Sequence, residues 1–181
     1  VPTSTVNIGT VTATIFDPKA TVQDFSIRIG EAIKLSSQII VLALKDDEIY
    51  SGEFRNISFK GYLSKNENID GKVDSLIIKD IDIAEIKSIV ESLITNPKSV
   101  PNQLDRLAFA QAKIENLRVQ GFHMGEPNLA LKLSSFDLLG VKNSKIEKLT
   151  MMGEVEVSKN GFAEDRARFR LGNLTLNKFD F

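Results

Sequence analysis

The sequence predicts a mainly β protein, a β-rich α+β fold in which curved antiparallel sheet of roughly six to ten strands packs with one principal helix. Three observations support this fold class. Apolar residues alternate with polar ones over most of the 181 residues. Turn-forming residues separate the alternating segments, and a single segment near the middle has helical periodicity.

The first alternating segments predict strands over 6–16, 22–30, 37–44, 54–63 and 73–83. The first strand changes phase at Gly9, as a β-bulge would produce. Asp17 and Pro18 mark the turn that follows it. The segment 37–44 is apolar on both faces, which is typical of a strand in the centre of a sheet. The polar stretch 64–72 is expected to be a loop between two strands.

The helix is predicted to follow directly, over 82–96. Asp82 and Glu85 form a start that resembles a capping box, and Asn96 and Pro97 end the segment. Apolar residues recur between them at helical spacing, at Ile83, Ile86, Val90, Leu93 and Ile94. The segment 104–113 is either a short second helix or the lead into a strand. Further strands are predicted over 114–124, 128–139, 146–157 and 167–181, with turns at 125–127 and 158–161.

One pattern recurs along these strands: an apolar residue, any residue, a small or polar residue, an apolar residue, any residue and an apolar residue. Its copies begin at Val22, Phe54, Val73, Ile114, Ile146 and Leu171. Most copies continue after a two-residue step, which reverses the alternation. The apolar row therefore changes faces there, or the strand bends to keep it inside. Gly61, Gly121 and Gly153 lie in such steps and suit a bulge.

The spacing of the pattern indicates a possible duplication. Val22 and Phe54 are 32 residues apart, and so are Ile114 and Ile146. The chain is therefore expected to be either a single β-rich domain over 1–181 or two similar tandem units over 1–95 and 96–181.

The segments IENLRVQGF and FRLGNLTLNKFDF resemble the β-repeat proteins of Gram-negative cell envelopes, the AsmA-like group. The resemblance implies curved sheets with an apolar inner face, a periplasmic or cell-envelope location and a role in lipid handling. It transfers no catalytic residue to this chain.

The amino-acid composition limits the kinds of functional site and partner that can be expected. The chain has no cysteine, one histidine and 23 basic against 24 acidic residues, so no thiolate site, no cofactor and no nucleic-acid partner are expected. His123 is expected to be a surface residue rather than a catalytic one. The acidic run Asp46, Asp47 and Glu48 lacks the spacing of a calcium loop. The longest apolar run, 39–44, is too short to span a membrane.

Arginines occupy alternate positions near the end of the chain, at Arg166, Arg168 and Arg170. On a strand these three share one face. They either meet a carboxylate or a phosphate, or they form a solvated outer face.

The predicted function is a non-enzymatic envelope protein that binds a lipid-like or other apolar ligand, or packs against a partner through a sheet face. The alternative is a structural or adhesive surface module with no small-molecule ligand. Exposed strand edges also make a homodimer possible. The residues expected to face the ligand are Phe25, Ile27, Phe59, Leu117, Val119, Leu131, Leu133 and Met151.

Overall fold

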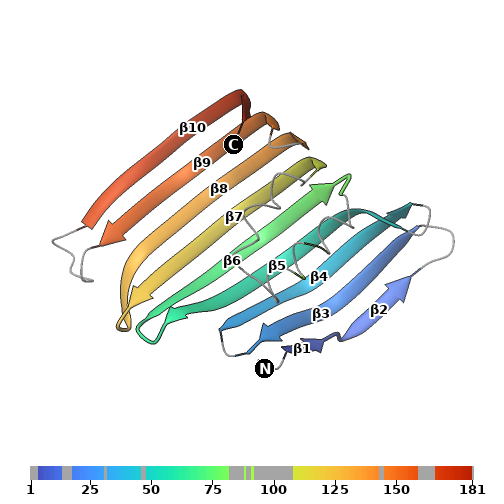
Figure 1. The fold of residues 1–181 in the computed structure, drawn as a ribbon, viewed down its shortest axis with the longest axis horizontal. Coiled ribbons are helices and arrows are strands. Elements are labelled where there is room, and N and C mark those ends of the chain that lie inside the picture. The colour runs from blue at the N-terminus through green and yellow to red at the C-terminus, as the bar shows by residue number, and fades with distance from the viewer. Residues whose placement is uncertain are drawn as a thin grey trace.

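The computed structural model describes residues 4–13, 18–30, 32–45, 48–81, 88, 91, 108–142, 145–158 and 166–180. These residues form one antiparallel sheet of ten strands, so the prediction of a mainly β protein is confirmed (Figure 1). The strands are β1 (Ser4–Asn7), β2 (Thr10–Ala13), β3 (Lys19–Ile29), β4 (Ile33–Lys45), β5 (Glu48–Ser64), β6 (Glu67–Lys79), β7 (Phe109–His123), β8 (Glu126–Lys142), β9 (Lys145–Ser158) and β10 (Arg166–Asp180).

The sheet is a meander in which each strand from β3 to β10 pairs with the next one along the chain. The short strands β1 and β2 both pair with β3 and form one edge, while β10 forms the other (Figure 1). The sheet is open and does not curl, so the expected curvature is not confirmed. The reversals of alternation that suggested bending are absorbed within the strands instead.

The expected helix of 82–96 is not confirmed, because it lies almost entirely outside the described residues. Ser88 and Glu91, which belong to it, have helical backbone, but every regular element of the described part of the chain is a strand. Of the segment 104–113, residues 104–107 lie outside the described residues, and the part from Phe109 onward belongs to strand β7.

The expected loop over 64–72 is wrong. Strand β5 continues to Ser64 and β6 begins at Glu67, so the turn between them holds two residues. Asn68, Asp70 and Lys72 made this stretch look like a loop. They alternate with less polar residues and all point to one face of the sheet.

Strand pairing is interrupted at one level across the whole width from β3 to β10. Paired residues are missing or the register shifts there in every neighbouring pair of strands. We call this line the crease, and it passes through Asp24, Gln38, Asn56, Asp74, Asn116 and Ser134. Apolar rows lie on each side of it. The alternation reverses as the strands cross it, except in β9, where Met151, Gly153 and Val155 keep the same phase.

Side chains compensate for the missing backbone pairing at the crease. Asp24, Asn56 and Asn116, on alternate strands, have φ angles of 53°, 52° and 53°, a conformation that Asn and Asp adopt more readily than most residues. Asn56 Nδ2 donates a hydrogen bond to Gln38 Oε1 (2.7 Å), and Asn116 Nδ2 donates to Asp74 Oδ2 (2.9 Å). The crease is therefore a hydrogen-bonded line of polar residues.

Candidate functional site

The two faces of the sheet differ in chemistry on one side of the crease. We call this side the site half; it comprises residues 25–37, 57–73, 117–133 and 153–171. Residues that pair across neighbouring strands point to the same face, and successive residues along a strand point to opposite faces. The pairing registers therefore assign each described side chain of the site half to a face.

One face of the site half carries two neighbouring rows of mainly apolar residues, which we call the apolar face. The first row holds Ile27, Leu35, Phe59, Gly71, Val119, Leu131, Val155 and Phe169. The second row holds Phe25, Ser37, Ile57, Val73, Leu117, Leu133, Gly153 and Leu171.

These rows contain all but one of the residues that the sequence predicts to face a ligand. Only Met151 falls on the other side of the crease, where it pairs with Phe136 and Leu174. The structure thus brings the predicted residues onto one face, and whether they contact a ligand stays a prediction.

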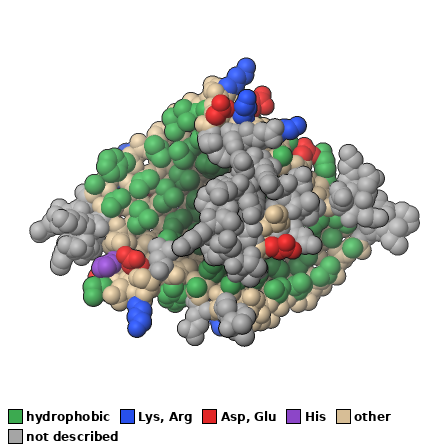
Figure 2. Space-filling model, in the orientation of Figure 1, with side chains coloured by type: hydrophobic (Ala, Val, Ile, Leu, Met, Phe, Trp, Pro, Cys, Tyr) green, Lys and Arg blue, Asp and Glu red, His purple; other side chains and the backbone are tan. Residues whose placement is uncertain are grey.

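The apolar face is most exposed at the β9–β10 end. Figure 2 shows apolar side chains gathered over β8, β9 and β10, while charged side chains gather toward the margins of the view. Phe169 is 61% exposed and Val157 is 44% exposed, whereas Leu133, in the neighbouring row, is buried. Contiguous exposed apolar surface of this kind is typical of interaction sites.

The opposite face of the site half carries two hollows, with volumes of about 510 and 720 Å³, which share Lys34 and Lys60. Their linings combine basic side chains with polar residues, and the smaller hollow also touches Phe59, Gly71, Val119 and Leu131 of the first apolar row. We call the two hollows together the basic groove, defined by Arg28, Lys34, Lys60, Lys65, Lys72, Arg118 and Lys132. Asp70 is the only acidic residue among the described residues that line it.

Most of these cations are direct neighbours in the sheet. Lys34 pairs with both Arg28 and Lys60, and Arg118 pairs with both Lys72 and Lys132. Like charges at directly opposed positions of neighbouring strands repel one another. The groove is therefore a place where positive charge is concentrated at a cost to the folded state.

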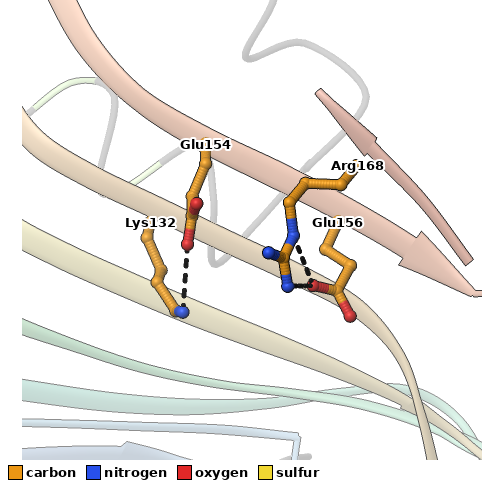
Figure 3. A network of polar contacts seen from close by, with 4 residues as sticks. All are labelled: Lys132, Glu154, Glu156 and Arg168. Carbon is orange, nitrogen blue, oxygen red and sulfur yellow. Dashed lines mark hydrogen bonds and ion pairs between the residues drawn. The ribbon is translucent and has the colours of Figure 1, made fainter. Parts of the chain in front are cut away.

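Acidic residues on β9 flank the groove (Figure 3). Lys132 Nζ lies 3.1 Å from Glu154 Oε1, and Arg168 donates hydrogen bonds through Nε (3.1 Å) and Nη2 (2.8 Å) to Glu156 Oε2. The Lys132 ammonium lowers the pKa of the Glu154 carboxyl below its ordinary value, and Glu156 raises the pKa of Arg168. Arg168 thus meets a carboxylate, one of the outcomes expected for the arginine row.

Asp70 lines the groove and pairs with Lys60 on one side and Gln120 on the other. Its Oδ1 atom is buried and accepts no hydrogen bond, although Lys60 Nζ is 3.7 Å away. Lys60 also lies 5.4 Å from the ring centre of Tyr62, in a cation–π contact. Lys60 is thereby held between an acid and an aromatic ring.

The remaining candidates for chemistry have ordinary positions. His123 is exposed, and its Nδ1 lies 3.6 Å from Glu67 Oε1. Asp46 and Asp47 lie outside the described residues, as does the side chain of Glu48. No group of three or more His, Cys, Asp or Glu side chains able to hold a metal ion occurs within the described ranges. The described residues include no helix that is long and apolar enough to cross a membrane.

Sequence reasoning missed the basic groove. Its residues are spread between positions 28 and 132, and the chain as a whole has a formal charge of −1. A signal was present, because each strand of the site half from β3 to β8 places a cation between two residues of the apolar face, as in IKL, FKG, GKV, LRV and LKL. Only the strand register shows that these cations meet.

No protein-family model, no curated protein sequence and no solved structure matches this chain. The resemblance to the AsmA-like group therefore stays a prediction, and the fold and its two faces are the evidence from which function is inferred.

Proposed function

We propose that this protein is a non-enzymatic binding protein of the cell envelope that takes up a lipid-like or other apolar ligand on its apolar face. The main support is the continuity of the apolar rows, which run across the sheet from β3 to β10 and are interrupted only by small residues such as Gly71 and Ser37. A long apolar chain lying across the strands would contact one residue of each strand in turn.

The exposed end of the apolar face supplies the binding energy. Covering Phe169, which is 61% exposed, would contribute about 1–2 kcal/mol if full burial of such a side chain is worth about 1.5–3 kcal/mol. Replacing it by serine is therefore expected to weaken ligand uptake about 5- to 30-fold. The effect on folding should be small, because most of this side chain contacts solvent.

The proposal is tested by mass spectrometry of an organic extract of the purified protein, and by titration of the delipidated protein with a fluorescent fatty acid. Phe169→Ser should reduce both the extracted lipid and the fatty-acid affinity. Arg170→Ser is the matched control, since Arg170 is the next residue and points to the opposite face. Equal loss in both variants, or no uptake by the unmodified protein, would refute binding on the apolar face.

A second candidate is a structural or adhesive module that associates through the edge of the sheet. Strand β10 spans 15 residues and pairs with β9 on one side, while no described strand pairs with its other side. Such an edge offers backbone groups to another strand. The register shift between Leu171 and Leu174 divides the edge into two portions, Arg166–Leu171 and Leu174–Asp180, and the second is interrupted again at Lys178.

Edge association predicts dimers that form as concentration rises. Sedimentation velocity from micromolar to millimolar protein should show them, and Leu176→Lys, at a position 42% exposed on β10, should suppress them by adding repelling charge. Monomers throughout this range would exclude the edge-associated form. Dimers unaffected by Leu176→Lys would place the contact elsewhere.

A further inference from the structure

We propose that the basic groove is an anion-binding site for a ligand that carries several closely spaced phosphate groups. The pairing registers place the cations of the groove on the face opposite the apolar rows, so this proposal concerns a different set of side chains from the apolar-ligand site. It rests on three features of the described residues: segregation of charge, repulsion between neighbouring cations, and the spacing of the cations.

Charge is strongly segregated at the groove. The whole chain has 23 basic and 24 acidic residues, yet the lining of the groove combines seven cations with the single carboxylate of Asp70. A concave surface of one sign focuses the electrostatic potential and attracts counterions. Lys34, Lys72 and Arg118 have no ion-pair partner within the part of the chain that the structure describes.

The placement of these cations opposes folding. A sheet gains stability when opposite charges face each other on neighbouring strands, yet Arg118 lies between Lys72 and Lys132, and Lys34 lies between Arg28 and Lys60. Charged arrangements that destabilise a protein are common at functional sites. A bound polyanion would turn both sets of repelling neighbours into attractive contacts.

The spacing suits linked phosphates. Lys72, Arg118 and Lys132 lie on three adjacent strands, so their backbones span about 10 Å at the usual strand separation. Arginine binds phosphate through a bidentate pair of hydrogen bonds, and lysines beside it add point charges. Ser58 and Gln120 also line the groove and add polar groups.

Nucleic acid fits the groove less well than a compact polyphosphate does. Proteins that bind single strands stack bases on exposed aromatic rings. Tyr62 is the one aromatic residue of this face among the described residues that line the groove, and its ring is in cation–π contact with Lys60. The phosphates can come from a soluble polyphosphate or from the headgroups of an anionic lipid, and the experiment separates these sources.

The test is isothermal titration calorimetry of the full chain with inorganic tripolyphosphate at low salt, with parallel flotation on phosphatidylglycerol and phosphatidylcholine vesicles. Arg118→Gln and Lys72→Gln should each weaken tripolyphosphate binding about 10-fold or more. Lys148→Gln, the same change at an exposed lysine across the crease, should alter it less than about 2-fold. Rising salt should weaken binding of the unmodified protein.

The outcomes are distinct. Flotation with phosphatidylglycerol that is lost in Arg118→Gln supports the proposal with a lipid headgroup as the source, while tripolyphosphate binding alone supports it with a soluble source. Equal losses in Arg118→Gln and Lys148→Gln, no binding of either probe, or binding of a single-stranded oligonucleotide in place of both would overturn it.

Thermal unfolding separates a lost site from a damaged fold. Because Arg118→Gln removes repulsion, the Tm of the free variant should stay the same or rise by about 1–3 °C. The rise in Tm that tripolyphosphate causes in the unmodified protein should disappear. A lower Tm in the free variant would show that Arg118 stabilises the sheet, which contradicts the proposal.

Discussion

Gly71 is a position at which a single added methyl group should damage the sheet. It lies directly opposite Phe59 in the apolar face, and the Phe59 ring covers it. A Cβ atom added to Gly71 would lie 2.5 Å from Cε2 of Phe59, and closer still to Cζ and Cε1. Carbon atoms in contact normally lie about 3.5–4.0 Å apart. The ring must therefore move by an ångström or more.

The cost of Gly71→Ala follows from that displacement. Overpacking of this kind costs about 1–3 kcal/mol, and expelling the ring would forfeit a similar amount of buried apolar surface. For a chain of 181 residues this predicts a fall in Tm of about 2–10 °C. Urea unfolding followed by circular dichroism should give the same loss as a lower midpoint at unchanged slope.

Two further variants isolate the cause. Gly172→Ala is the control, because a Cβ there meets nothing within 4 Å, and it should be neutral or slightly stabilising. With Phe59→Ala already present, Gly71→Ala should cost less than about 0.5 kcal/mol, since no ring remains to clash. Equal costs at Gly71 and Gly172, or an undiminished cost without the Phe59 ring, would refute this account.

Further predictions concern the flank of the groove and the crease. Lys132→Gln should raise the pKa of Glu154 toward its ordinary value, because Lys132 is the main cause of its depression; a carboxyl NMR titration would show it, and an unchanged pKa would contradict the pairing. Any stability from this pair is present above the unfolded-state pKa of Glu154 and is lost as the pH falls through the lower, folded-state value. Ser37→Ala should lower the free energy of unfolding by about 1 kcal/mol, because the buried Ser37 hydroxyl donates toward the carbonyl oxygens of Ile39 and Arg55; a urea midpoint equal to that of the unmodified protein would count against this role.

Local patterns predicted the strands well because alternation depends on neighbours in sequence. Two of the expected two-residue steps hold a left-handed residue at their second position, Asp80 and Lys178, with φ angles of 54° and 50°, whereas Gly61, Gly121 and Gly153 in other steps do not have a positive φ. The structural outcome of the steps was not predicted. A left-handed residue resets a strand within the plane of the sheet, so the strands need not bend as expected.

The two candidate sites differ in how far the sequence could reveal them. Alternation alone assigns residues such as Val119 and Leu131 to one face, which is why the apolar face was anticipated. The basic groove depends on the strand register. Lys60 and Lys132 come from distant parts of the chain, and they line the same hollow only because of the way the strands between them pair. The expectation of a loop over 64–72 also prevented Asp70 and Lys72 from being assigned to a face. In a stretch with so many polar residues, the alternation of a strand is difficult to recognise.

The crease also constrains how the length of the chain can vary. All strands from β3 to β10 cross it at matching positions, so one extra residue inside a strand would exchange the two faces of that strand beyond the insertion. The neighbouring strands would keep their original orientation, and a charged side chain would then interrupt an apolar row. Additions and deletions are therefore harmless only where the chain reverses direction, and the strand interiors behave as segments of fixed length.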